Sequence, residues 1–121
     1  MREEFLTYLN QEKEKVLAEE QQLIADERKD EATFCRIASN IYDILATLYQ
    51  TAGNLAKKDA ISDETVVAAI FMEKTQKVTA NWKKSYEVAK EHNDVAKILV
   101  EETKLQTVDK ILAEYKRLTE V

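Results

Sequence analysis

The chain has 121 residues and a mass of 14.0 kDa, about the size of one ordinary domain, which excludes an enzyme with separate cofactor and substrate domains. Hydrophobic residues make up 45% and charged residues 34%, with one glycine and no proline. This composition is too apolar for a disordered tail and too poor in turn formers for a β-sandwich. We therefore expect one all-α domain that spans residues 1–121.

The chain is acidic, with a formal charge of −5 at pH 7, and most of the excess lies in residues 1–30. An acidic segment repels phosphate backbones and anionic lipid headgroups, so nucleic acid and membrane are disfavoured partners. The single Cys35 cannot form an intrachain disulfide, and no apolar run is long enough for a membrane span. These features predict a cytoplasmic protein.

The first two amphipathic segments have helical periodicity but differ in how much apolar surface they carry. Residues 2–28 carry a narrow apolar stripe, whereas apolar residues of 31–52 cover more than half of the helix circumference. Asp30 is suited to cap the second helix. Gly53 predicts its end, because glycine readily takes the left-handed conformation that closes many helices.

The third segment has the clearest start in the chain. Ser62 is suited to be the N-cap, and Ile61 is placed to pack against Val66 one turn on. A polar interval later in the segment predicts a kink or break near 77–81. The last helix is expected over 94–120, after a turn at His92, Asn93 and Asp94.

Two reversals of the chain, near Asp30 and Asn93, decide the architecture. If the chain turns at both, the segments form an antiparallel up-down bundle of about four helices. If either junction stays helical, a second copy would have to cover the exposed apolar face, which gives an exchanged or elongated dimer.

The residues needed for known site chemistry are absent or isolated. A di-iron bundle needs Glu-x-x-His pairs, but His92 is the only histidine and Ala89 stands three residues before it. Pairing of Cys35 with His92 is disfavoured, because an apolar setting makes a thiol inert. With a single glycine there is no phosphate-binding loop. We therefore predict no catalytic residue, no cofactor and no metal site.

A carboxylate in the last helix is expected to face inward. Glu101 and Glu102 interrupt the apolar line between Leu99 and Leu105. Lys13, on the narrow stripe of the first segment, is the candidate partner for it.

Four aromatic residues are the candidate interaction or pocket residues. Trp82 and Tyr86 lie one turn apart, and Tyr42 and Tyr49 lie two turns apart, on the third and second segments. Such residues most often pack in the core, but they also line pockets and anchor interfaces.

The leading hypothesis is a non-enzymatic module that binds a protein partner or associates with itself, for example as a homodimer. It rests on the missing site chemistry and on the incomplete apolar stripe of the first segment. The alternative is a bundle that binds an apolar or aromatic small molecule in an aromatic-lined pocket between helices two and three.

Overall fold

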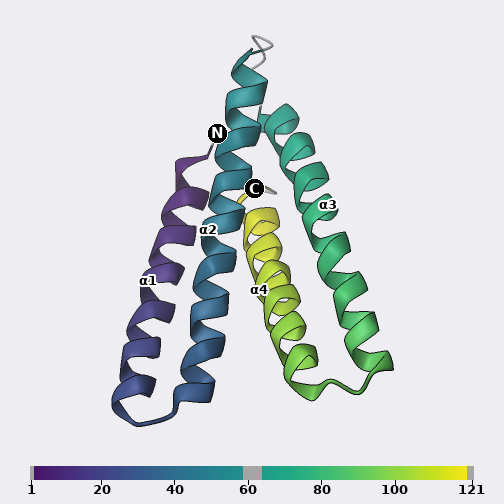
Figure 1. The fold of residues 1–121 in the computed structure, drawn as a ribbon. Coiled ribbons are helices and arrows are strands. Elements are labelled where there is room, and N and C mark those ends of the chain that lie inside the picture. Colours follow the sequence, from purple (N-terminus) through teal and green to yellow (C-terminus); the bar gives the residue numbers. More distant parts are fainter. Residues whose placement is uncertain (1, 59–63, 120–121) are drawn as a thin grey trace.

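The computed structural model describes residues 2–58 and 64–119, and in that part of the chain four helices form and no strand. The helices are α1 (Glu3–Ala25), α2 (Lys29–Lys58), α3 (Glu64–Glu91) and α4 (Val95–Thr119). Successive helices run in opposite directions along the molecule (Figure 1). The prediction of an all-α, up-down bundle of about four helices is therefore confirmed.

The chain reverses at both junctions that the sequence left open, and the two turns use the same backbone geometry. Glu27 and Asn93 take the left-handed conformation, with φ of 61° and 53°. In each turn, the next amide donates back to a carbonyl five residues earlier, which closes the preceding helix. These hydrogen bonds are Arg28 N to Leu23 O at 2.8 Å and Asp94 N to Ala89 O at 3.0 Å. The exchanged dimer that a continuous helix would require is therefore not needed.

The two capping residues behave differently. Asp94 precedes α4, and its Oδ1 accepts a hydrogen bond from Lys97 N at 3.2 Å, which is N-cap geometry. The prediction that Asp30 caps α2 is wrong, because the helix already begins at Lys29, two residues after left-handed Glu27. Asp30 lies in the first turn, where its charge still favours the helix N-terminus.

Gly53 does not end the second helix. α2 continues to Lys58, and Gly53 does not have a positive φ. Gly53 is buried beside Ala52 and Ala56, so packing of small residues outweighs the cost of about 1 kcal/mol for glycine inside a helix. The cap and the apolar contact predicted at Ser62 and Ile61 fall outside the described residues.

α3 is also uninterrupted where a kink or break was expected, since residues 77–81 are helical throughout. Thr75 and Thr79 of the polar interval are buried, and Thr79 Oγ1 donates to Gln76 O at 3.2 Å. Such bonds satisfy a hydroxyl within its own helix. Thr75 and Thr79 thus lie on the buried face of a continuous helix, whereas Glu73, Gln76 and Lys77 are exposed.

The main hydrophobic core fills one half of the bundle. In α1 and α3, the core residues lie at or before Val16 and Trp82. In α2 and α4, they lie at or after Ile41 and Val108. We call this half the closed end. Toward the two turns the hairpins α1–α2 and α3–α4 diverge (Figure 1), and no residue of 17–40 or 83–107 belongs to that core. We call this half the open end.

None of the four described helices combines the length and apolar character needed to cross a lipid bilayer.

Candidate functional site

One aromatic ring from each helix meets at the closed end. The rings are Phe5, Tyr49, Phe71 and Tyr115, and all six pairs have centroids between 4.6 and 5.6 Å apart. Each residue is at most 4% exposed. Edge-to-face pairs of this kind contribute about 0.5–1.5 kcal/mol beyond their buried area. This aromatic cluster therefore joins all four helices at one point.

Two hydroxyls of the cluster converge on one carboxylate. Tyr49 Oη donates to Glu64 Oε1 at 2.6 Å, and Tyr115 Oη donates to the same oxygen at 3.0 Å. Tyr49 Oη in turn accepts a hydrogen bond from the backbone N–H of Arg2, the N-cap of α1, at 2.6 Å. The polar network links the same four helices as the rings do.

Burial, followed by the interaction with Glu64, raises the pKa of Tyr49 and of Tyr115 well above the ordinary value. Both phenols are therefore neutral donors across the physiological range and are poor nucleophiles. The network consequently holds helices together, and neither phenol is an acid or base tuned to neutral pH.

Sequence reasoning identified Tyr49 but not the other three rings of the cluster. Apolar periodicity shows which face of a helix is buried, but not which rings meet across helices. A signal was nevertheless present: an offset of 66 residues relates Phe5 to Phe71, Tyr49 to Tyr115, and the left-handed Glu27 to Asn93. The two hairpins thus repeat one arrangement, and each contributes a Phe and a Tyr.

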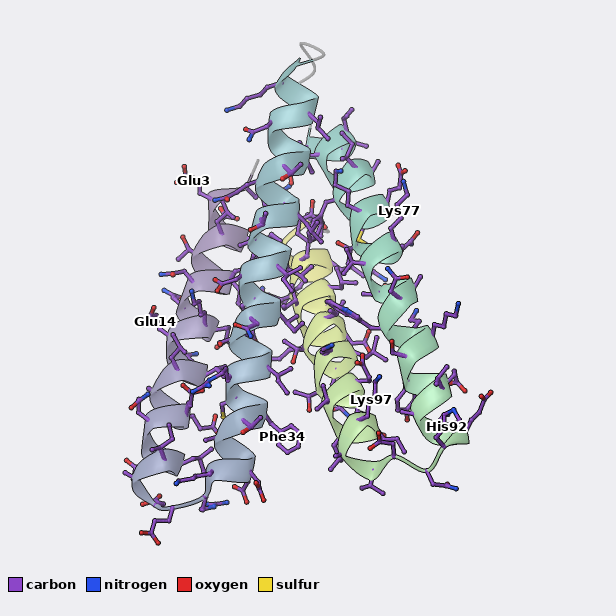
Figure 2. The ribbon with its side chains drawn as sticks, viewed as in Figure 1. Glu3, Glu14, Phe34, Lys77, His92 and Lys97 are labelled. Atoms are coloured by element: carbon purple, nitrogen blue, oxygen red, sulfur yellow. The ribbon has the colours of Figure 1, made fainter. Side chains whose placement is uncertain are left out.

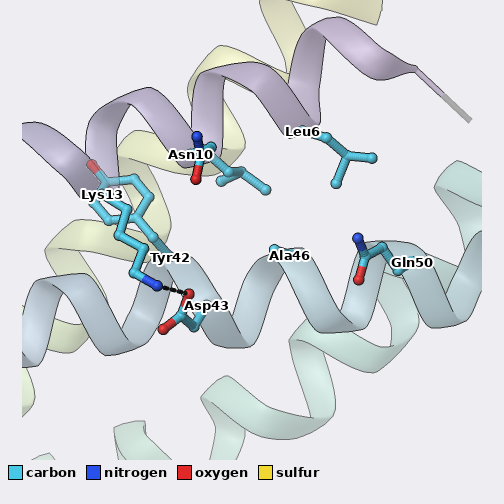
Figure 3. Close-up of a pocket in the computed structure, with 8 residues that line it drawn as sticks. Leu6, Asn10, Lys13, Tyr42, Asp43, Ala46 and Gln50 are labelled. Atoms are coloured by element: carbon cyan, nitrogen blue, oxygen red, sulfur yellow. Dashed lines mark ion pairs between the residues drawn. The ribbon is translucent and has the colours of Figure 1, made fainter.

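Of the predicted aromatics on α2, Tyr49 lies in the cluster and Tyr42 lies toward α1. Tyr42 is buried and lines a hollow of about 170 Å³ between α1 and α2 (Figure 3). Lys13 and Asp43 close one side of this hollow with an ion pair of 2.7 Å.

The predicted aromatics on α3 lie on the α4 side. Trp82 is half-buried, with Lys104 Nζ 5.6 Å from its ring centroid. Tyr86 Oη donates to Glu102 Oε1 at 2.9 Å, and Lys90 Nζ lies 4.7 Å from the Tyr86 ring. These contacts put Trp82 and Tyr86 at the α3–α4 interface, whereas Tyr42 lies at the α1–α2 interface.

The inward carboxylate of the last helix is Glu101, which is buried, but its predicted partner is wrong. Glu101 Oε1 pairs with Lys104 Nζ at 3.2 Å, one turn along α4. Lys13 faces α2 and pairs with Asp43. A lysine one turn away reaches a buried carboxylate more directly than one on another helix.

The two candidate nucleophile and base residues lie on different hairpins. Cys35 is half-buried on α2, and burial, followed by the carboxylates of Glu19 and Glu20, raises the pKa of its thiol. The thiol is therefore protonated and weakly reactive at neutral pH. His92 lies exposed in the turn between α3 and α4. Among residues 2–58 and 64–119, no group of three or more His, Cys, Asp or Glu is placed to hold a metal ion.

The open end leaves large apolar side chains uncovered. Val95 is 65% exposed and Leu99 is 43% exposed, one turn apart on α4, and Val88 and Ile24 are exposed near the same two turns. Phe34 is half-buried and projects from α2 into the space between α2 and α4 (Figure 2). Exposed apolar residues gathered at one end of a molecule are typical of a contact surface.

Comparison with models of protein families, with curated proteins and with solved structures finds no match to this chain.

Proposed function

We propose that this protein is a non-enzymatic interaction module whose open end binds another polypeptide chain. The observation that carries the proposal is the unequal distribution of the core: the buried core surrounds the aromatic cluster, and apolar side chains remain in contact with water near both turns. Removing such side chains from water contributes about 25 cal/mol per Å². A partner that covers the open end therefore lowers the free energy of the system.

The two ends have complementary roles in this proposal. The aromatic cluster and the Glu64 network fix the relative position of the four helices at one end. Helix pairs that extend from such a fixed point present preformed surfaces, which lowers the entropy cost of binding. The protonated Cys35 thiol suits a reducing compartment, so the proposed location is the cytoplasm.

Site-specific photo-crosslinking in living cells tests the proposal. A photoreactive amino acid is placed at position 99 in the open end and, as a matched control, at position 55 near the other end of α2. Leu99 and Leu55 are similarly exposed, at 43% and 39%. We expect a discrete crosslinked species from position 99 and none from position 55. No discrete species from position 99, or equal labelling at both positions, would contradict the proposal.

A second candidate function, binding of an apolar small molecule, is supported by one groove between α3 and α4. The groove measures about 460 Å³, and its apolar lining includes Ala68, Met72, Leu112 and Ala113. This site differs from the pocket predicted between helices two and three. A fragment screen on protein with ¹³C-labelled methionine methyl groups tests it, because a ligand in the groove must shift the Met72 signal. If no fragment shifts that signal, the groove is not a ligand site.

A further inference from the structure

We propose that the polypeptide bound at the open end is a second copy of this chain. In the dimer, the tip of the α1–α2 hairpin of each copy lies against the tip of the α3–α4 hairpin of the other. This inference rests on the proposed function and names the partner. We call residues 19–37 tip 1 and residues 83–100 tip 2; each contains one turn and the adjoining helix ends.

The two tips carry opposite free charge. In tip 1, Arg28 pairs with Glu31 and Arg36 with Glu20, which uses both arginines. Among the described residues, the charges of tip 1 left without an ion pair are Glu19, Asp26, Glu27, Asp30 and Lys29. The same count in tip 2, after the Lys90–Glu87 pair, leaves Lys83, Lys84, Lys97, Glu91 and Asp94. Tip 1 is thus negative and tip 2 is weakly positive, with three free lysines.

This charge distribution selects one of the possible two-fold arrangements. In Figure 1 the two tips lie on opposite sides of the open end. If two copies meet open end to open end about a two-fold axis perpendicular to this view, tip 1 meets tip 2 on both sides. A two-fold axis parallel to the line that joins the two tips would instead place tip 1 against tip 1 and oppose two negative surfaces. Like charges placed against each other disfavour that arrangement, so the first one is selected. It is also closed and cannot extend into fibres.

The surface area of the chain agrees with a dimer. From the scaling of accessible surface with mass, a compact monomer of this mass exposes about 6,700 Å². The described structure exposes 7717 Å². The excess of about 1,000 Å² is close to the roughly 800 Å² that each partner contributes to an interface of standard size. The chain therefore exposes, beyond a compact monomer, about as much surface as a stable dimer covers.

Apolar side chains in the same region supply the contact that the charges orient. Phe34 projects into the space between α2 and α4, and Val95 and Leu99 are exposed on tip 2. Aromatic and aliphatic anchors of this kind carry most of the binding free energy, while charges at the rim set orientation and association rate. The dimer should therefore weaken, without disappearing, as ionic strength rises.

Sedimentation equilibrium of the purified full-length chain gives the first test. We expect a species of twice the 14.0 kDa chain mass, with a dissociation constant that rises with salt. Two charge-reversal variants give the second test. Variant one carries Glu19→Lys and Glu27→Lys in tip 1, and variant two carries Lys83→Glu and Lys97→Glu in tip 2. All four side chains are exposed, so both variants should fold, which far-ultraviolet circular dichroism verifies.

Each variant alone should dimerise at least about tenfold more weakly, because tips of like sign then meet on both sides. An equimolar mixture of the two variants should recover the dimer, because every contact in the mixed dimer again joins opposite charges. The control Lys57→Glu changes an exposed lysine on α2 near the closed end and should leave the dissociation constant unchanged.

A chain that stays monomeric up to millimolar concentration would overturn the inference. So would a dimer that neither variant weakens, or a mixture that does not recover it. If the chain is monomeric but position 99 still crosslinks to a protein of different mass, the second copy is wrong and the proposed function stands. If the chain is monomeric and position 99 forms no crosslink, both are wrong.

Discussion

Removing the hydroxyl of Tyr49 should lower the free energy of unfolding more than removing the hydroxyl of any other tyrosine that donates to a glutamate. The change Tyr49→Phe keeps the ring in the aromatic cluster but deletes two hydrogen bonds, one to Glu64 Oε1 and one from Arg2 N. The residue is 0% exposed, so water cannot replace either partner. A buried hydrogen bond to a charged group contributes about 1.5–3 kcal/mol.

We therefore expect Tyr49→Phe to lower the free energy of unfolding by about 2 kcal/mol. For a domain of this length the corresponding fall in Tm is about 8 °C. Urea unfolding followed by circular dichroism at 222 nm measures the change, and the slope of the transition should stay the same because the surface exposed on unfolding is unchanged.

Tyr86→Phe is the matched control. Tyr86 also donates to a glutamate, Glu102, at 2.9 Å, but this pair lies at the solvent-accessible end of the α3–α4 interface. Water can replace that bond, so the unfolding midpoint should hardly move. Equal losses for the two variants, or a Tyr49→Phe midpoint within error of the unchanged chain, would refute the assignment of the Glu64 network as the point that joins the helices.

Four further predictions follow from the same contacts. Because the pKa of Tyr49 and of Tyr115 is raised in the folded chain, the unfolded chain releases these protons first as pH rises. The free energy of unfolding should therefore fall above about pH 10. A Tyr49→Phe/Tyr115→Phe variant should lose less stability over that range, as melting temperatures measured against pH will show. Phe5→Ala should cost about 3–5 kcal/mol in urea unfolding, because it removes one ring from a fully buried cluster, whereas Phe34→Ala in dilute protein should cost far less. Glu27→Gly should raise Tm, because a left-handed residue with a side chain costs about 1 kcal/mol. Asn93→Gly should raise Tm less, because asparagine tolerates that conformation. Equal increases in Tm would contradict this interpretation of the two turns. In native-state hydrogen exchange, amides around Tyr49 and Ile111 should be protected longer than those of tips 1 and 2; uniform protection would contradict the division into closed and open ends.

The sequence was sufficient to predict the class of fold, because each helix carries its own apolar periodicity. It left open whether the chain reverses near Asn93, where Asn93 takes the left-handed conformation and Asp94 caps the next helix. The same reasoning failed at Gly53, since a glycine that stops a helix and a glycine that packs inside one have the same local sequence signal. Only the neighbouring buried Ala52 and Ala56, which belong to the tertiary core, decide between them.

The candidate site was less predictable than the fold. Tyr49 was identified as a candidate, but its partners Phe5, Phe71 and Tyr115 come from three other helices, and pairing across helices depends on register. The partner of Glu101 was missed for a different reason: helix geometry already places Lys104 one turn away, so the sequence alone was sufficient to propose this pair. No local sequence pattern predicts that the hairpins diverge, because the divergence depends on which end of the bundle holds the large aromatic rings.

The aromatic cluster lies far from the turn of each hairpin, so a small rotation there moves the turn by a large distance. Every ring lies 20 residues from the turn end of its helix: Phe5 from Ala25, Tyr49 from Lys29, Phe71 from Glu91 and Tyr115 from Val95. At 1.5 Å per residue, about 30 Å of helix separates each ring from its turn, so a rotation of about 10° about the cluster displaces the turn by about 5 Å. A small change in packing at the four rings would therefore change the separation of the two tips by about the width of a side chain.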